Sequence, residues 1–413
     1  MNKEQQRRNA RRRRKRRRRM SYRQKIVYMQ ITLITVAIFL GLLVGAAALT
    51  KVMNNRQAQN SEKTASQEQQ EETTEPKKDD SSTDNTDDTS KDSQEETTTP
   101  EPTAEPVSIT VSMVGDCTLG TDVNFDQSTS FDAFYQMKND PGYFFQNVKD
   151  IFTADDLTVA NMEGTLTTSN DRQQKTFAFK GNPSYTEILT QGGVEATNLA
   201  NNHSADYGDV SLSDTIKYLN EAGISNFIGT NTAIRDVNGI SVGLVGIDAL
   251  DETEAAKLEN VIGSVKSLGA QLVIVSIHWG EEKATAPNDT QIELAHKAID
   301  AGADLVLGTH PHVLQGIEKY NGKYIAYSLG NFCFGGNNNP ADKDTVIYRQ
   351  TFTFVDGVMQ EDDNMTLIPA TISGHDEYND YQPAIAEGDR KTQIENKLIE
   401  YSTPLGLSAL NFR

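Results

Sequence analysis

Short apolar runs alternate with amphipathic stretches along the C-terminal three quarters of the chain. Eight runs rich in β-branched residues predict strands, at 107–115, 157–161, 193–200, 225–230, 240–248, 271–279, 303–310 and 323–332. Residues 209–223 and 289–302 are amphipathic and predict helices, and each ends in the glycine that is common at a helix C-terminus. Strands that alternate with helices are typical of an α/β domain with mostly parallel, buried strands. The sequence after about Thr351 is less regular and ends in a polar tail.

The N-terminal quarter has a different pattern. Residues 1–25 form a basic segment with fourteen Lys and Arg, and the 24 residues at 26–49 carry no charge. At about 1.5 Å per residue, this apolar run is long enough to cross a ~30 Å hydrocarbon core, and it predicts a transmembrane helix. A cleaved signal peptide is the alternative, because AAALT supplies small residues, although the apolar core of a signal peptide is usually shorter. The basic flank predicts a cytoplasmic tail and a single-pass cell-membrane protein whose C-terminal domain is extracellular.

Residues 50–106 form a polar segment of Ser, Thr, Gln, Glu, Asp and Pro with almost no large apolar side chain. Such a composition cannot bury enough apolar surface to offset chain entropy, so we expect a disordered acidic stalk. The whole chain has a formal net charge of −19 despite its basic N-terminus, so the domain at 107–413 is strongly acidic. This charge argues against a nucleic-acid partner, unless bound cations reverse the local field.

Polar side chains that can bind metals follow the predicted strands. The residues at these strand ends are Asp116, Asn161, Glu163, Asn202, His203, His278, His310 and His312, which include four of the six histidines. In open α/β sheets, ligands bind beyond the carboxyl ends of the strands, so we expect these side chains to converge on one site. Singly, each residue is as consistent with a helix cap or a buried structural histidine; together they favour a metal site.

The segment 307–316 reads LGTHPHVLQG and holds two of these histidines. Pro311 favours an extended conformation for His310, and in an extended chain residues i and i+2 point to the same side. Both imidazoles are therefore expected to face one centre. Imidazole and carboxylate ligands suit divalent Zn, Mn, Fe or Ni, whereas two cysteines are too few for thiolate ligation.

Seven motifs give the chain a resemblance to a known family. They are MVGDCTLG, VANMEGTLT, FKGNPSY, NLANNHSADYG, SIHWGEE, GTHPHVLQG and YSLGNF. They are similar to the motifs of the poly-γ-glutamate capsule biosynthesis (CapA/PgsA-like) family, a branch of the calcineurin-like metallophosphoesterase superfamily. The resemblance covers roughly residues 107–375. It implies an α/β fold with a two-sheet metallophosphoesterase-like sandwich, flanked by helices, and a metal centre at the edge of the sheets.

The resemblance also implies a role for each residue at the centre. Asp116 is expected to bind one ion, Glu163 to bridge, and Asn202 and His278 to bind the second ion. His310 and His312 are expected to divide between the two, and His203 is the expected catalytic residue that moves a proton or contacts substrate. Thr118 and Glu163 stand where the wider superfamily has His and Asp, so the centre is expected to hold one or two ions.

Four polar residues are candidate substrate contacts: Asn161, Lys180, Glu282 and Asn331. Three of them have a structural alternative, Lys180 as a solvated lysine, Glu282 as a surface acid at a helix start and Asn331 as a turn former. Trp279 and His296 are expected to be structural. Cys117 and Cys333 each lie beside a strand-end motif, and the sequence leaves open whether they form a disulfide or remain buried free thiols.

The function favoured by these features is poly-γ-glutamate biosynthesis or export, with a metal-dependent hydrolase-like or transferase-like site that acts on or holds the anionic polymer. The alternative is a non-catalytic polymer-binding, export or anchoring subunit with a structural metal, placed beside membrane-bound synthase subunits. The sequence lacks a Gly-x-x-x-x-Gly-Lys-Ser/Thr loop for ATP, so polymerisation by this chain alone is not expected.

Overall fold

The structure is a computed structural model that describes residues 105–361 and 363–413. The predicted basic tail and transmembrane helix, and nearly all of the predicted stalk, lie outside these residues. Among the helices that the structure does describe, none has the length and apolarity needed to cross a membrane.

Within the described residues, nine strands form sheet 1. Its main path has the order β17-β16-β14-β1-β2-β5-β6, while β13 pairs with β1 and β15 pairs with β14. The strands are β1 (Val107–Thr118), β2 (Leu157–Met162), β5 (Ala196–Asn198), β6 (Ser225–Phe227), β13 (Asn331–Phe334), β14 (Asp344–Val355), β15 (Val358–Met359), β16 (Met365–Thr371) and β17 (Ala384–Ile385). β1, β2, β5 and β6 are parallel, and β14 joins them antiparallel to β1.

Six strands of the described chain form sheet 2, in the order β11-β12-β10-β9-β8-β7. They are β7 (Ala233–Val237), β8 (Ile240–Asp248), β9 (Leu272–His278), β10 (Leu305–Thr309), β11 (Ile317–Tyr320) and β12 (Lys323–Ala326). The four inner strands are parallel, and the two edge strands are antiparallel to their neighbours. A small parallel pair, β3 (Thr165–Leu166) and β4 (Lys180–Gly181), lies apart from both sheets.

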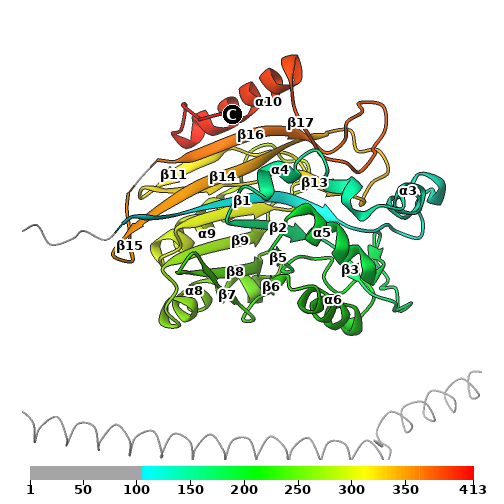
Figure 1. Ribbon diagram of the computed structural model, residues 1–413, viewed down its shortest axis with the longest axis horizontal. Coiled ribbons are helices and arrows are strands. Elements are labelled where there is room, and N and C mark those ends of the chain that lie inside the picture. The colour runs from blue at the N-terminus through cyan, green and yellow to red at the C-terminus, as the bar shows by residue number, and fades with distance from the viewer. Residues whose placement is uncertain (1–104, 362) are drawn as a thin grey trace, which may run out of the picture. The chain divides into compact units, whose positions relative to one another are not determined.

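The two sheets pack face to face, with helices outside them (Figure 1). One buried cluster joins side chains of both sheets, such as Val111 and Val159 from sheet 1 and Leu244 and Ile274 from sheet 2. Two further clusters lie on the outer faces, beneath helices. The helices are α3 (Phe131–Lys138), α4 (Lys149–Phe152), α5 (Thr186–Gly192), α6 (Asp209–Glu221), α7 (Glu252–Ala255), α8 (Leu258–Ser267), α9 (Asp289–Asp300) and α10 (Gly388–Ser402), with 3-10 turns η1 (Gln127–Thr129), η2 (Pro141–Phe145), η3 (Pro183–Tyr185) and η4 (Thr403–Leu405). Truncating a fully buried residue such as Leu244 to Ala would cost about 2–5 kcal/mol.

The structure confirms the mixed α/β class and places a strand within each of the eight predicted runs. The predicted helices are α6 and α9, and α9 begins with a capping box between Asn288 and Gln291. The expectation of an irregular C-terminal region is wrong. β14, β16 and α10 form there, and β14 alternates buried and half-buried residues along its second half. The prediction failed because the presumed boundary at Thr351 cut this alternating strand in two.

Parallel pairing brings several strand ends to one edge of the sandwich. Asp116 of β1 lies opposite Asn161 of β2, and His278 of β9 lies opposite Thr309 of β10. β1 also approaches the segment before β13 closely. The Asp116 amide donates a hydrogen bond of 3.0 Å to the Gly330 carbonyl. A Cβ atom at Gly115 would lie 1.9 Å from that carbonyl oxygen, so only glycine fits there.

Candidate metal centre

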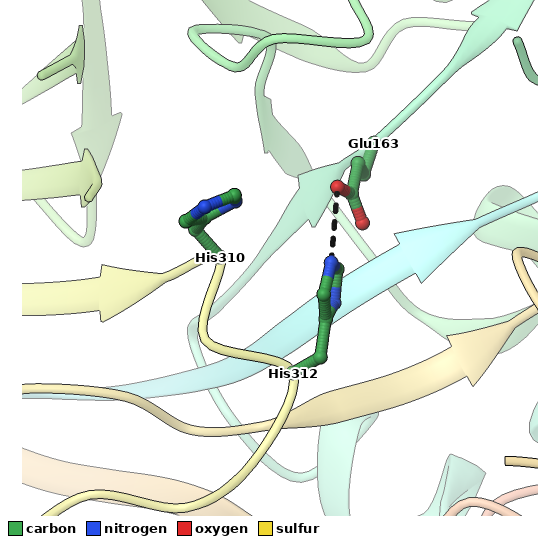
Figure 2. A group of neighbouring side chains, drawn as sticks. All are labelled: Glu163, His310 and His312. Atoms are coloured by element: carbon green, nitrogen blue, oxygen red, sulfur yellow. Dashed lines mark ion pairs between the residues drawn. The ribbon is translucent and has the colours of Figure 1, made fainter. Parts of the chain in front are cut away.

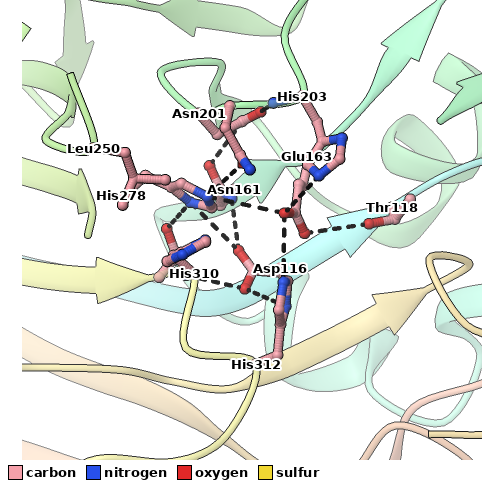
Figure 3. A network of polar contacts seen from close by, with 12 residues as sticks. Asp116, Thr118, Asn161, Glu163, Asn201, His203, Leu250, His278, His310 and His312 are labelled. Carbon is pink, nitrogen blue, oxygen red and sulfur yellow. Dashed lines mark hydrogen bonds and ion pairs between the residues drawn. The ribbon is translucent and has the colours of Figure 1, made fainter. Parts of the chain in front are cut away.

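Six of the predicted site residues meet at the carboxyl edge of both sheets (Figure 3): Asp116, Glu163, His203, His278, His310 and His312. Asp116 lies near the end of β1, and Glu163 follows β2 directly. The loop after β5 carries Asn202 and His203, β9 ends at His278, and the turn after β10 carries His310 and His312. Five separate strand ends therefore supply one cluster, as the strand-end pattern predicted.

Asp116 is fully buried, and side-chain amides support it from one side. The Asn161 amide donates to Asp116 Oδ1 at 2.7 Å, and the Asn161 oxygen in turn accepts from Asn198 at 2.9 Å. On the other side, the backbone amide of His310 donates to Asp116 Oδ2 at 3.2 Å. The carboxylate is thus fixed in direction by both sheets.

Glu163 is also fully buried, but its Oε1 atom has no hydrogen-bond partner among the described residues. Three imidazole Nε2 atoms surround this oxygen, from His312 at 3.7 Å and from His203 and His278 at 3.9 Å each. These separations exceed hydrogen-bond length. This buried carboxylate oxygen accepts no hydrogen bond and lies among three imidazole nitrogens. Such an arrangement is expected where a cation binds.

A divalent ion fits this set of atoms. Ligand atoms around an ion with bonds of about 2.1 Å lie roughly 3.0–3.5 Å apart, slightly closer than these nitrogens are to Glu163 Oε1. One ligand atom each from Glu163, His310 and His312 lies within 4.8 Å of the others (Figure 2). The buried His310 Nδ1 atom likewise has no hydrogen-bond partner in the described chain. Carboxylate and imidazole together suit Zn, Mn, Fe or Ni.

Burial and mutual charge perturb these groups strongly. Burial raises the pKa of Glu163 to about 7, and the Asp116 charge adds to this while His312 opposes it. Burial also opposes ionisation of Asp116, yet the hydrogen bond and charge of His312 hold the pKa of that carboxyl below its ordinary value. For His312, burial is outweighed by the charges of Glu163 and Asp116, which raise its pKa to about 10. A protonated His312 thus supplies positive charge to two buried carboxylates.

The other two buried imidazoles behave oppositely. Burial lowers the pKa of His278 well below its ordinary value. Burial and the charge of His312 lower the pKa of His310 as well. Both rings are therefore neutral near pH 7, which is the form that binds metal.

The predicted extended conformation of His310 is wrong. His310 has φ +96° and His312 has φ +57°, values in a region that non-glycine residues rarely adopt. The tertiary hydrogen bond from the His310 amide to Asp116 overrides the local preference imposed by Pro311. The two imidazoles do lie on the same side, with ring centroids 5.8 Å apart, but a strained turn brings them there.

Asn202 lies at the rim of the cluster. Its Oδ1 atom is 3.0 Å from His278 Nε2, while His278 Nδ1 is 2.9 Å from the Thr309 hydroxyl. The neighbouring Asn201 is the buried amide, and it donates to the Met162 carbonyl at 2.9 Å. The metal-ligand role of Asn202 stays a prediction. The Asn202 Oδ1 atom faces His278, the other expected ligand of the same ion.

Sequence reasoning missed two partners of His203. Its Nδ1 atom lies 2.7 Å from Asp206 Oδ2 and 3.2 Å from Lys175 Nζ. Asp206 follows three residues after His203, a spacing of about one helical turn that signals proximity. Lys175 lies 28 residues upstream in a segment with no periodic pattern, and no sequence signal connects it to His203.

The four candidate substrate residues differ in placement. Asn161 and Asn331 are buried behind the centre, and Asn331 Oδ1 lies 2.9 Å from His312 Nδ1. Lys180 donates to the Ser169 carbonyl at 2.9 Å and lies over the Tyr207 ring. Glu282 is exposed. Asn161 and Asn331 thus position ligand residues, and substrate contact by any of the four stays a prediction.

The remaining singled-out residues are structural. Trp279 is buried, and its indole donates to the Tyr327 carbonyl at 2.8 Å. His296 lies on α9 and pairs with Glu318 at 2.8 Å, as expected of a residue outside the site. Cys117 and Cys333 are buried free thiols, which decides against the disulfide alternative. Burial raises the pKa of Cys117 to about 12.

Residues 110–336 match the family described as "Bacterial capsule synthesis protein PGA_cap". The match covers more than half of the 413 residues. The chain belongs to this family. Every proposed ligand of the PGA_cap centre, from Asp116 to His312, lies within the matched region, and the predicted family resemblance is confirmed.

Three curated relatives have similar regions. The PGA biosynthesis protein CapA of Bacillus subtilis (strain 168) is 33% identical over 214 residues, which cover 46% of this chain and 56% of that protein. The capsule biosynthesis protein CapA of Bacillus anthracis is 30% identical over 257 residues, 55% of this chain and 60% of that protein. A probable polyglutamine synthesis accessory protein of Mycobacterium tuberculosis (strain CDC 1551 / Oshkosh) is 31% identical over 214 residues, 43% and 56% of the two chains. The chain therefore matches a little over half the length of each relative.

A solved structure of a hypothetical protein from Thermus thermophilus covers 63% of this chain and 99% of its own. It shares 17% identity with a TM-score of 0.39, a level at which two structures need not share a fold.

Proposed function

We propose that this chain is a membrane-anchored, extracellular protein of poly-γ-glutamate capsule biosynthesis or export, with a metal centre that acts on or holds the anionic polymer. Two of the curated relatives are named as capsule or PGA biosynthesis proteins, and the chain belongs to the same family. The observation that carries the metal centre is the unpartnered Glu163 Oε1 among three imidazole nitrogens.

The fold and the anchor belong to the same proposal. Two stacked sheets with polar residues at one carboxyl edge support a metallophosphoesterase-like domain. The uncharged run at 26–49, next to fourteen basic residues, supports a single membrane helix with the domain outside the cell.

The chemistry follows from what surrounds the centre. A bound divalent ion supplies Lewis-acid polarisation of an amide or phosphoryl oxygen. Its charge also offsets the acidity of the domain where carboxylates of a polymer would dock. Asp116 and Glu163 would hold the cation, His278 and His310 would offer neutral nitrogens, and His203 would move a proton beside it. With its Nδ1 engaged by Asp206, His203 faces the centre through Nε2.

The test compares two histidine substitutions in the purified full-length protein. Metal content and hydrolysis of γ-linked glutamate polymer and of a generic phosphodiester are measured for wild type, His278→Ala and His296→Ala. We expect His278→Ala to lose both metal and activity. His296 is half-buried on α9 and pairs with Glu318 away from the centre, so His296→Ala serves as the matched control and should keep wild-type metal content and activity. Activity that survives His278→Ala would exclude this site.

A non-catalytic role in binding, exporting or anchoring the polymer is the second candidate. It is favoured by the number of protein groups at the centre, because Glu163 and the imidazoles around it suffice to close a tetrahedral shell, as in structural sites. An exchangeable ion with a coordinated water would favour the enzyme. A tightly held ion without water, in a domain that still binds the polymer, would favour the anchor.

A further inference from the structure

A strap of residues 171–179, between the small strands β3 and β4, passes beside His203. Two buried carboxylates fasten it. Asp122 pairs with Arg172 at 2.7 Å and accepts from the Ala178 amide at 2.6 Å. Asp206 accepts from the Phe179 amide at 2.5 Å. The strap thus has two anchors of similar chemistry, of which only Asp206 contacts a residue of the centre.

Lys175 ties the strap to the loop that carries His203. Its ammonium donates to Asp206 Oδ1 at 2.7 Å and to the Asn202 carbonyl at 2.8 Å. It lies 3.2 Å from His203 Nδ1. A single cation therefore contacts the acid, the backbone and the ring at once, and its side chain is only 30% exposed.

The hydrogen bonds specify which nitrogen of His203 carries the proton. A carboxylate accepts but does not donate, so Asp206 Oδ2 at 2.7 Å requires a proton on Nδ1. Lys175 therefore cannot donate to Nδ1, and its protons go to Asp206 and Asn202. When the ring carries a single proton, its lone pair is then at Nε2, the atom 3.9 Å from Glu163 Oε1. The Phe179 ring, 4.4 Å from the imidazole, restricts it on one side.

We propose that Lys175 is a positioning residue that locks the Asp206–His203 pair so that an unprotonated His203 Nε2 faces the centre. The Nε2 lone pair can then bind the cation or take up a proton, and Nε2 carries no proton to donate at rest. The expected effect of Lys175 on metal affinity rests on the proposed function, whereas its effect on the tautomer of His203 does not. Without Lys175, Asp206 Oδ1 and the Asn202 carbonyl lose their donor, so both the acid and the loop can turn.

The experiment compares Lys175→Met with Arg172→Met, which removes the cation of the same strap that pairs with the other anchor, Asp122. Nitrogen-15 spectra of the metal-free protein, in which the His203 signals are assigned by their loss in His203→Gln, report the tautomer at a fixed neutral pH. Affinity for Zn²⁺ is measured by competition with a chelating dye. Lys175→Arg tests rescue, because a guanidinium also donates to a carboxylate. Thermal melts check that each variant is folded.

We expect wild type, Arg172→Met and Lys175→Arg to show a protonated Nδ1 and a bare Nε2. Lys175→Met should show mixed tautomers and bind Zn²⁺ about 10-fold more weakly, the lower end of the effect of removing an outer partner of a ligand. Equal losses in Lys175→Met and Arg172→Met, or an unchanged His203 spectrum in Lys175→Met, would overturn the inference. A wild type that binds no Zn²⁺ would sink the proposed function, while the nitrogen spectra would still decide the role of Lys175.

Discussion

The two sheets bring different chemistry to the same edge. Sheet 1 contributes the carboxylates Asp116 and Glu163, and sheet 2 contributes the imidazoles His278, His310 and His312. Neither set alone supplies both kinds of ligand, because the negative charge that attracts a cation comes from the acids, whereas the neutral nitrogens come from His278 and His310. Closing the sandwich creates the centre, so a bound ion would connect the two sheets and stabilise their packing.

The two sides are also held differently. Asp116 of sheet 1 lies on a chain of amide side chains through Asn161 and Asn198. His310 of sheet 2 is held by backbone in a rare conformation, with its amide bound to Asp116. Asp116 is thus preorganised by hydrogen bonds, whereas His310 and His312 are preorganised at the cost of backbone strain.

The largest loss of metal affinity is expected when a carboxylate of sheet 1 is replaced. Glu163→Gln keeps the shape but removes the charge among the three imidazoles. Metal affinity should fall on the order of 100-fold, because loss of a ligand should cost at least the upper end of the effect of losing an outer partner of a ligand. Isothermal titration calorimetry measures this change. The exposed Glu282→Gln is the control and should bind as wild type; equal affinity of the two variants would exclude Glu163 as a ligand.

A pH series separates the metal-free and metal-bound states. The pKa values of Glu163 and His312 are raised to about 7 and about 10 from ordinary values near 4.5 and 6.5, so the folded state binds their protons more tightly than the unfolded state. Their stabilisation is complete below those ordinary values and is lost as the pH rises through 7 and 10. The Tm of metal-free protein should therefore fall by several degrees between pH 5 and 9.

Added metal should reverse that trend, because a cation displaces the protons that hold the carboxylates together and binds more tightly as pH rises. The increase in Tm on adding Zn²⁺ should thus grow from pH 5 to 9. A metal-free Tm that rises over this range would contradict the assignment of the protons to Glu163 and His312.

The backbone strain at His310 predicts a smaller effect, on the stability of the folded protein. In metal-free protein, His310→Gly should be more stable than His310→Ala by about 1 kcal/mol, because glycine adopts positive φ without the penalty that a Cβ carries. Chemical denaturation of both variants measures the difference. If alanine is the more stable, the turn at His310 is not strained.

The smallest effect is expected at Thr118, which donates to Glu163 Oε2 across 3.5 Å. This bond is long and therefore weak. Thr118→Val should reduce metal affinity by no more than about threefold, in keeping with a bond worth well under 1 kcal/mol. A loss as large as that of Glu163→Gln would show that Thr118 itself holds the ion.

Much of this arrangement could be predicted from the sequence, because strand ends of parallel sheets meet at one edge. That rule placed Asp116, Glu163, His278, His310 and His312 together before any contact was known. It could not decide which of the adjacent amides, Asn201 or Asn202, turns inward, since both follow β5. Local rules also failed at His310, where a tertiary hydrogen bond outweighed the preference set by the following proline.

The partners of His203 illustrate a second limit. Asp206 is near in sequence, but Lys175 reaches the ring from a strap without periodicity, and only the folded chain places it there. Strand β14 was missed although its alternation of buried and half-buried residues is regular. It runs across Thr351, where the regular pattern of strands and helices was assumed to end.

The close approach of Gly115 to Gly330 has a consequence for mutational scanning. These glycines carry no chemistry, yet a methyl group at position 115 would collide with the Gly330 carbonyl, the acceptor for the Asp116 amide. Any substitution there must move the backbone that aims Asp116. A mutational scan that measures activity alone would therefore show the same loss at Gly115 as at the metal ligands. A scan that also measures the yield of folded protein would show that Gly115 is needed for the close packing of the backbone and not for metal binding.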